Sequence, residues 1–383
     1  MLTQAQLIDL RKTLHQHPEL SRQEATTAQR IQSVFSKFAP DETHTQLGGE
    51  GLAFVFNGHE AGLSTLIRCE LDALPIEEVN TFNHRSCVCG VSHKCGHDGH
   101  MAMVAALGAV LATNRPKRGR VILCFQPAEE TGTGAIDMVN DPRFTSLMPD
   151  YAFALHNYPG LELGKVAVRS GTFNCASRGM IITLKGITSH AAHPEDGLSP
   201  ALAMCQIIEQ LHQLPASLNR QDTNDRDWVT VIHAKLGEVA FGTSPGDAVV
   251  MATLRSESNE GMATLVEQAE LIARECAQQG KLKVQFDYQD VFQASVNSEE
   301  GCQRVVMACE HNTVPYHLMT EPMRWSEDFG QFTAVAKQGA MFALGAGTKS
   351  PQLHNPDYDF PDALIPIGRD LFLSLIEDIN GLN

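Results

Sequence analysis

Short apolar runs alternate with helical stretches through the first part of the chain. GLAFVF, STLIRCE, RVILCFQ and YAFALHN predict buried strands, and MAMVAALGAVLA at 101–112 predicts a helix that is apolar on nearly all sides. Strands without polar alternation are typical of sheets that are covered on both faces. The pattern therefore predicts an α/β domain with a largely parallel sheet.

The first 38 residues predict two helices. LTQAQLIDLRKTLHQH places its leucines on one face, and Pro18 ends this helix. Ser21 and Glu24 match a capping box, which would begin a second helix that continues through Phe38.

Residues from about 174 to 289 follow a different pattern. RGMIITLKG, WVTVIHAKL, AVVMATLRS and LKVQFDY predict strands, and LSPALAMCQIIEQLHQL and GMATLVEQAELIARECAQQ predict helices. Their order along the chain is βαββαβ, which is typical of a small ferredoxin-like α+β domain. The first pattern then returns with a helix near 299–311, another helix after SEDFG and the apolar run AMFALGAG. We therefore expect one α/β domain, formed by 1–173 and 290–383, that is interrupted by an inserted domain at 174–289.

The composition argues against some binding partners and indicates the cellular compartment. The formal net charge of the 383 residues is -16, which argues against nucleic acid and anionic membranes because both require a basic face. The N-terminus lacks a signal-peptide core, and no window is apolar over the length of a membrane span. The ten cysteines are scattered, so we expect reduced thiols in a cytoplasmic protein.

Side chains that can bind metal follow the predicted strands. Parallel sheets of this kind bind ligands beyond the carboxyl ends of their strands, so these side chains are expected to converge. The candidates are Glu70 and Asp72 after STLIRC, Cys95, His97 and His100 in KCGHDGH, Glu129 and Glu130 in QPAEE, His156 after YAFAL, and His354 after AMFAL and its glycine-rich loop.

The chemistry of KCGHDGH and QPAEE fits a metal centre. Cys95 and His97 are two residues apart, so in an extended segment they point the same way. The helix that follows would favour the thiolate of Cys95, which is the form that coordinates metal. Glu129 and Glu130 would face different directions, so that one can bind metal while the other faces a reacting water.

Simpler interpretations exist for each residue alone. Cys87, Cys89 and Cys95 with His93 could form a structural zinc knuckle, although their spacing is not a standard one. The remaining cysteines are expected to be small buried apolar side chains. Adjacent glutamates are often a solvated helix cap, and a histidine such as His156 can be a satisfied loop residue.

Together the motifs resemble the M20 metallopeptidase superfamily, in particular its amidohydrolase branch of hippurate hydrolases, N-acyl-amino-acid amidohydrolases and indole-acetyl-amino-acid hydrolases. The matching segments are LHQHPELS, RCELDALP, KCGHDGH, FQPAEE, ALHNYPG, SHAAHP, RWSEDFGQF and LHNPDYDF. CGHDGH followed by QPAEE is the most specific pair. The resemblance extends over nearly the whole chain.

The resemblance implies two divalent metal ions per subunit and a role for each motif. The implied metal ligands are Cys95, His97, Glu130, His156 and His354. Glu129 would be the general base and acid, and His190 of SHAAHP would stabilise the oxyanion, often in the active site of the partner subunit. The inserted domain would serve as a lid and mediate homodimerisation.

Further residues are expected to support the site. Asp72 would orient a ligand, as would His100 and Glu70. Arg255, at the end of AVVMATLR, is a candidate for holding a substrate carboxylate, with a surface or interface salt bridge as the alternative. His190 and His193 could instead cap the next helix.

Three other features leave alternatives open. Glu327 and Asp328 are either helix caps or neighbours of the site. The branch usually has aspartate where this chain has Glu70, and usually has Asn-x-Ile-Pro where this chain has Gly-Thr-Ser-Pro at 242–245. The second departure leaves the substrate preference open, but the implied ligands and base are unaltered.

The sequence thus predicts a cytoplasmic, metal-dependent amidohydrolase that cleaves the amide bond of N-acyl amino acids with a metal-activated water. A dipeptidase or aminopeptidase-like enzyme of the same superfamily is one alternative, and a metal-binding protein without activity is another. A zinc deaminase would need a Pro-Cys-x-x-Cys segment, which the sequence lacks. One thiolate, three imidazoles and a carboxylate favour Zn²⁺, and Mn²⁺, Co²⁺ or Ni²⁺ are also compatible.

Overall fold

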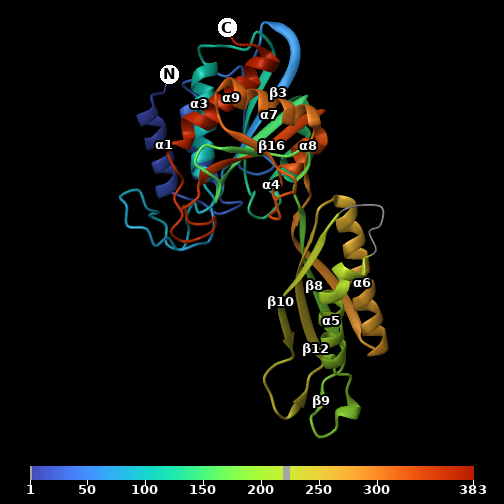
Figure 1. Cartoon of the computed structure of the whole chain (residues 1–383). Helices are drawn as coiled ribbons and strands as arrows, with labels where there is room; N and C mark the ends of the chain where they lie inside the picture. Colours follow the sequence, from blue (N-terminus) through green and yellow to red (C-terminus); the bar gives the residue numbers. More distant parts are fainter. Residues whose placement is uncertain (1, 219–224) are drawn as a thin grey trace. The chain divides into compact units, whose positions relative to one another are not determined.

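A computed structural model describes residues 2–218 and 225–383 (Figure 1). The chain divides into two compact units, of which the first comprises Met1–Phe173, Ser295–Pro322 and Glu327–Asn383. The second comprises Asn174–Ala294 and Met323–Ser326. The short segment 323–326 groups with the second unit because it bonds to it, for example through the Cys175 backbone N–H that donates to the carbonyl of Met323 at 3.0 Å.

The first unit is built on a mixed sheet whose centre is parallel. The strand order is β1-β2-β4-β3-β5-β16-β6-β15, and the pairs β4-β3, β3-β5, β5-β16 and β6-β15 are parallel. The strands are β1 (Glu42–Leu47), β2 (Gly51–Asn57), β3 (Glu60–Glu70), β4 (Arg118–Gln126), β5 (Tyr151–Pro159), β6 (Val166–Val168), β15 (Tyr316–Leu318) and β16 (Gln338–Gly347). The predicted α/β class with a mostly parallel sheet is confirmed, and the four apolar runs form β2, β3, β4 and β5.

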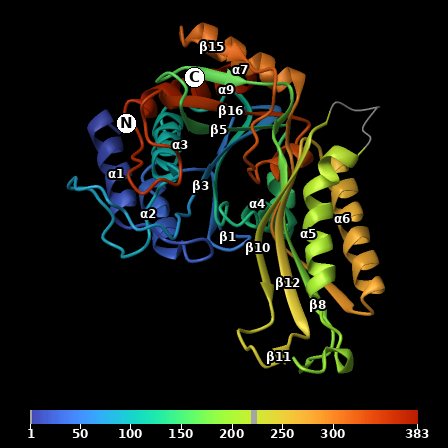
Figure 2. The same ribbon diagram turned by 60° about the horizontal axis from the view of Figure 1, so that its bottom comes forward.

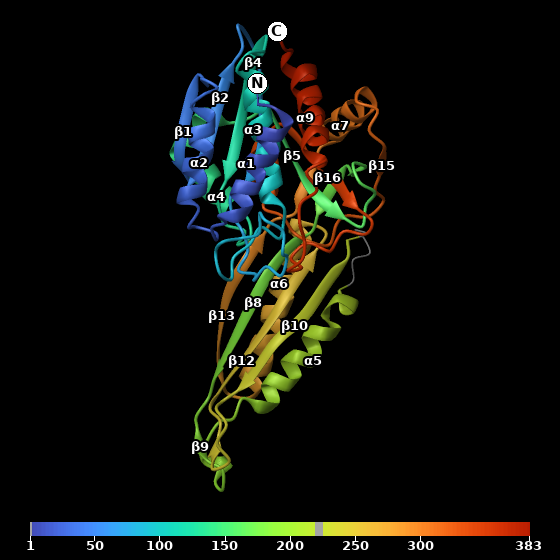
Figure 3. The same cartoon turned by 90° about the vertical axis from the view of Figure 1, so that its left-hand side faces the viewer.

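Helices cover both faces of this sheet (Figures 2 and 3). One face carries α2 (Ala25–Phe35), α3 (His97–Leu111), α7 (Glu299–His311) and α9 (Leu364–Asn380), with α1 (Gln4–Gln16) packed against α3. The other face carries α4 (Gly134–Asn140) and α8 (Gly330–Val335). Because α3 lies between the sheet and α1, nearly all its residues are buried, as its apolar sequence predicts.

The predicted capping box of the second helix is wrong. The Ser21 hydroxyl donates to Asp72 Oδ2 at 2.7 Å, and Glu24 Oε1 accepts from the backbone N–H of Ala128 at 2.8 Å. The first turn of α2 is capped by Glu19, whose Oε2 accepts from the Thr27 N–H at 2.6 Å. Ser21 and Glu24 therefore bond to residues that are distant in the sequence instead of capping α2. The helix ends at Phe35 instead of Phe38.

The second unit contains a four-stranded antiparallel sheet and two long helices. The order is β10-β12-β8-β13, and the elements are β8 (Ala176–Lys185), α5 (Ala201–Ser217), β10 (Asp227–Leu236), β12 (Asp247–Ser256), α6 (Asn259–Gln279) and β13 (Lys283–Phe292). Figure 2 shows α5 and α6 side by side along this sheet. This unit also contains the short pair of β9 (Ser189–His190) with β11 (Thr243–Ser244). A further short pair, β7 (Gly171–Asn174) with β14 (Ser295–Asn297), belongs to the first unit except for Asn174.

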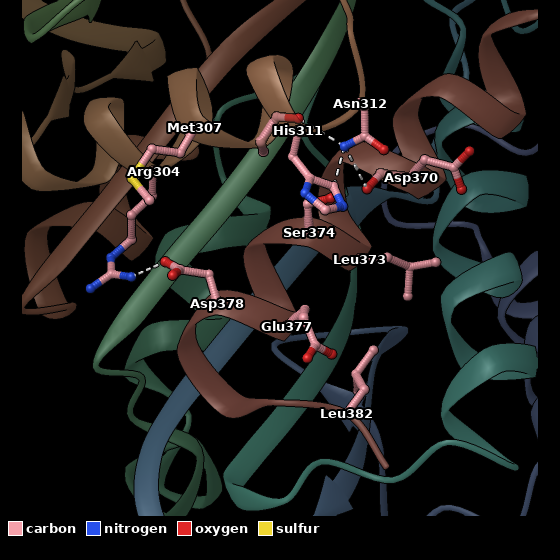
Figure 4. Close-up of a pocket in the computed structure, with 11 residues that line it drawn as sticks. Arg304, Met307, His311, Asn312, Asp370, Leu373, Ser374, Glu377, Asp378 and Leu382 are labelled. Carbon is pink, nitrogen blue, oxygen red and sulfur yellow. Dashed lines mark hydrogen bonds and ion pairs between the residues drawn. The ribbon is translucent and has the colours of Figure 1, made fainter.

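A surface pocket lies between α7 and α9 (Figure 4). Arg304 of α7 forms an ion pair with Asp378 of α9, and the Asn312 amide donates to the Ser374 hydroxyl at 2.7 Å. These contacts fasten α7 to α9. Within the part of the chain that the structure describes, no helix is both long and apolar enough to cross a membrane.

The packing of α3 predicts an effect of Gly108→Ala. A Cβ at this position would lie 2.5 Å from the buried ring of Phe35, so overpacking should outweigh the better helix propensity of alanine. We expect the free energy of unfolding to fall by about 1 kcal/mol in urea denaturation. Gly242→Ala is the control, since a Cβ there would meet nothing within 4 Å, and a stabilised Gly108→Ala variant would contradict the packing.

Candidate metal centre

Four neighbouring strands bring the predicted ligands together at one edge of the sheet of the first unit. β3 ends at Glu70, and Asp72 follows it; the turn after β4 carries Glu129 and Glu130; β5 carries His156, and the loop after β16 carries His354. These strands lie in the order β4-β3-β5-β16 and are parallel, so their carboxyl ends meet. α3 starts at this edge with His97.

The turn that carries Cys95 and His97 depends on Gly96. Gly96 has φ 95°, and a Cβ there would lie 2.4 Å from Oδ1 of Asn157. Only glycine combines this left-handed conformation with such a close approach. The turn places Cys95 Sγ 3.3 Å from Nε2 of His156, which is buried in β5.

His97 is oriented with one ring nitrogen toward two carboxylates. Its Nδ1–H donates to the backbone carbonyl of Asp72 at 2.9 Å, so Nε2 points toward Glu129 Oε2 at 3.8 Å and Glu130 Oε1 at 3.9 Å. Among the described residues, His97 Nε2 and Glu130 Oε1 are buried without a hydrogen-bond partner. These two atoms face each other beyond hydrogen-bond distance, and a cation between them would be bound by Oε1 of Glu130 and by Nε2 of the neutral imidazole.

The donor atoms form overlapping groups. The ligand atoms of Cys95, His97 and His156 lie within 4.8 Å of one another, and so do those of Cys95, Glu130 and His354. His354 is half-exposed, and its Nε2 lies 3.6 Å from Glu130 Oε2. Two groups that share Cys95 can hold two neighbouring ions, so the residues present fit the metal pair that the sequence implies.

The electrostatics of the site show an excess of buried negative charge. Burial, reinforced by the charges of Glu327, Glu130 and Asp328, raises the pKa of Glu129 well above its ordinary value. Burial also raises the pKa of Glu130 to about 7, against the opposing charge of His97. Bound cations would favour the charged carboxylates and remove most of this penalty.

The predicted preference of Cys95 for the thiolate form is wrong for the protein alone. Burial, together with the charges of Glu130 and Glu129, raises the pKa of this thiol well above its ordinary value. Burial and the nearby carboxylates therefore outweigh the start of α3, and a bound cation would favour the thiolate. Cys87 and Cys89 are exposed and belong to no donor group of the described residues, which argues against the zinc knuckle.

Arg68 is a fully buried cation near Glu129 that no sequence motif indicated. Its guanidinium forms ion pairs with Glu70, with Glu327 at 2.6 Å and with Asp328 at 2.9 Å. The carboxylates of Glu327 and Asp328 also form a group with Glu129. Of the two interpretations of Glu327 and Asp328, proximity to the site is therefore the one that the structure supports.

Buried hydrogen bonds orient the groups around the ligands. His100 Nε2 accepts from the Asn157 backbone N–H at 3.3 Å, so its Nδ1–H donates to Glu70 Oε2 at 2.7 Å. Asp72 Oδ2 accepts from the Glu130 backbone N–H at 3.0 Å, in addition to the Ser21 hydroxyl. Asp72, Glu70 and His100 thus form hydrogen bonds beside the candidate ligands, and their supporting roles remain predictions.

His190 and Arg255 lie in the second unit. His190 is exposed in β9, and its Nδ1 accepts from the Ala192 backbone N–H at 3.0 Å. His193 is also exposed and lies 3.5 Å from Glu195. Arg255 of β12 donates to the carbonyl of Arg324 at 2.8 Å and to the Ser326 hydroxyl at 2.9 Å. The roles of His190 and Arg255 remain predictions.

Asp98, the carboxylate inside KCGHDGH, points away from the donor groups and toward α1. Its Oδ2 lies 2.9 Å from His15 Nδ1, and His15 Nε2 lies 3.1 Å from Glu78 Oε1. Burial opposes the charged imidazole, but the hydrogen bonds to Asp98 and Glu78 outweigh it and raise the pKa of His15 to about 9. His15 is therefore a buried cation that contacts Asp98, the residue after His97.

Comparison with known proteins agrees with this site. The chain belongs to peptidase family M20/M25/M40, whose model matches residues 66–378. It is 28% identical over 375 residues to an N-acetyldiaminopimelate deacetylase from Lactobacillus helveticus (93% of this chain, 94% of the relative) and 27% identical over 380 residues to a hippurate hydrolase from Campylobacter jejuni (97% and 96%). The chain is thus a metal-dependent hydrolase of amide bonds.

The fold also matches solved structures of this family. A Bacillus subtilis protein described as a dinuclear metal-binding peptidase superposes with a TM-score of 0.83 at 23% identity, covering 98% of each chain.

The buried pair of His15 and Asp98 predicts a pH-dependent contribution to stability. Because the folded pKa of His15 is raised from 6.5 to about 9, its contribution is fully present below pH 6.5 and is lost as the pH rises to about 9. In chelator-treated protein, His15→Gln should therefore cost on the order of 3 kcal/mol at pH 6 and much less near pH 9.5. Urea denaturation followed by circular dichroism measures both, and an equal cost at the two pH values would contradict a charged His15.

Proposed function

We propose that this hydrolase cleaves the amide bond of N-acyl amino acids, with Glu129 as general base and acid. The observation that carries the proposal is the position of Glu129, whose Oε2 lies 3.8 Å from Nε2 of His97. Glu129 can itself join a donor group with His97 and Glu130, and we assign it the role of base because Cys95, His97, Glu130, His156 and His354 are the proposed ligands. The relatives named hippurate hydrolase and N-acetyldiaminopimelate deacetylase favour N-acyl amino acids as the substrate class.

Two divalent ions, with Zn²⁺ favoured by the donor set and Mn²⁺, Co²⁺ or Ni²⁺ compatible, would polarise the scissile carbonyl and lower the pKa of a water. Glu129 would accept the proton of that water at Oε2 and deliver it to the leaving amine. The backbone carbonyl of Asp72 would accept the hydrogen bond from Nδ1–H of His97 and so keep Nε2 of His97 directed toward the metal ions.

The second unit is proposed to be a ferredoxin-like lid and dimerisation domain. Its βαββαβ order and the strand order β10-β12-β8-β13 support this assignment. His190 would donate to the oxyanion in the active site of the partner subunit of a homodimer, and Arg255 would hold the substrate carboxylate. Closure of the lid would exclude water during the reaction.

Glu129→Gln tests the general base. We expect kcat on an N-acyl amino acid to fall by about 10²- to 10⁴-fold while the number of bound ions is unchanged, because the amide cannot accept the proton. Metal-loaded protein would be assayed for amine release from N-acetyl, N-benzoyl and indole-acetyl amino acids and from dipeptides. Glu162→Gln, an exposed glutamate, is the control.

The outcomes of this assay separate the candidate functions. Amine release from one class of N-acyl amino acids, lost in Glu129→Gln, supports the proposal. Amine release from dipeptides alone would assign the protein as a peptidase. An unchanged kcat in Glu129→Gln would contradict the general-base role.

A subunit-mixing experiment tests the role of His190. Glu129→Gln and His190→Gln homodimers are each expected to be nearly inactive. Mixing them after reversible dissociation should restore activity, because a hybrid dimer contains one site with both an intact Glu129 and an intact partner His190. Mixtures that remain inactive, although hybrids form by mass spectrometry, would contradict the shared site.

A further inference from the structure

Two loops that are distant in the sequence supply the donors of one candidate group. Cys95 belongs to the turn before α3, whereas His354 belongs to the loop between β16 and α9. The loops contact each other directly, since the His354 backbone N–H donates to the carbonyl of Lys94 at 2.9 Å. The group of Cys95, Glu130 and His354 therefore depends on the distance between these two loops. The group of Cys95, His97 and His156 does not involve the loop that carries His354.

The side chain of Lys94 is a second link between the loops. It is fully buried, and its Nζ donates to the Tyr358 carbonyl at 2.8 Å and to Asn80 Oδ1 at 3.0 Å, with a further ion pair to Glu78. The Tyr358 hydroxyl accepts from the Asn157 side-chain amide at 2.7 Å. The loop of His354 is thus bound to the residues that flank both Cys95 and His156.

Arg11 of α1 provides a third link. It is 1% exposed, and its Nη1 lies 2.7 Å from Asp359 Oδ1 and 3.4 Å from Asp98 Oδ2. Its Nε donates to Asp362 Oδ1 at 2.9 Å. One guanidinium therefore contacts the residue after His97 and two carboxylates of the loop that carries His354. A lysine offers a single donor point and cannot make both sets of contacts.

We propose that Arg11, together with Lys94, is a positioning residue that sets the distance between His354 and Cys95 and thereby the affinity of one of the two metal ions. Arg11 lies outside residues 66–378, so the N-terminal helix contributes to the metal centre from beyond the segment matched by the family model. The proposal rests on the ligand set of the proposed function but not on its substrate.

The test is metal binding by Arg11→Lys, with Lys12→Met as a control that removes the next cation of α1. Zn²⁺ and Co²⁺ affinities would be measured by chelator competition, with bound ions counted by native mass spectrometry. We expect the affinity for one ion to fall by about 10- to 100-fold in Arg11→Lys, while the other ion and the thiolate–Co²⁺ absorption of Cys95 are retained. Lys12→Met should bind both ions as the wild type does.

Asp362→Asn is a milder second variant, because this carboxylate is 27% exposed and its loss leaves Arg11 paired with Asp98 and Asp359. It should weaken the same ion to a smaller extent at an unchanged melting temperature of the metal-free protein.

Wild-type affinity for both ions in Arg11→Lys and Asp362→Asn would overturn the inference. Equal weakening of both ions, in parallel with a lower melting temperature, would also overturn it and assign a purely structural role. A wild-type chain that binds no metal would instead contradict the proposed function, and this inference with it.

Discussion

Burial of several carboxylates at one edge of the sheet is the constraint on which the rest of the first unit depends. Glu129 and Glu130 lie in the turn after β4, and Glu70 ends β3. Removing such groups from water is costly unless positive charge compensates them. Arg68 compensates Glu70, Glu327 and Asp328, but Glu130 Oε1 still faces the unpaired Nε2 of His97. A cation between these two atoms would therefore compensate the remaining carboxylate.

The same constraint explains why the supporting residues are buried and charged. Hydrogen bonds to the segments between the candidate ligands orient the donor atoms before an ion binds. Asp72 orients His97, and His100 connects Glu70 to the backbone of Asn157. The N-terminal helix extends this support through Arg11 and His15, which both contact Asp98.

Sequence patterns predicted the central strands, the inserted βαββαβ segment and the residues that converge at the site, because apolar runs and strand ends are local signals. The edge strand β1 was not predicted, since ETHTQL is polar and mostly exposed. Arg68 and Arg11 were missed because several of their partners are distant in the sequence, such as Glu327 at 259 residues from Arg68 and Asp362 at 351 residues from Arg11. The thiol of Cys95 was misjudged for a related reason: burial and then the carboxylates of Glu130 and Glu129 raise its pKa, and both depend on the tertiary structure.

Anomalous X-ray diffraction from metal-loaded crystals would locate each ion independently of activity. We expect two neighbouring peaks in the first unit that together are coordinated by Cys95, His97, Glu130, His156 and His354, with Glu129 beside them. A single peak, or peaks that leave Cys95 or Glu130 uncoordinated, would contradict this expectation.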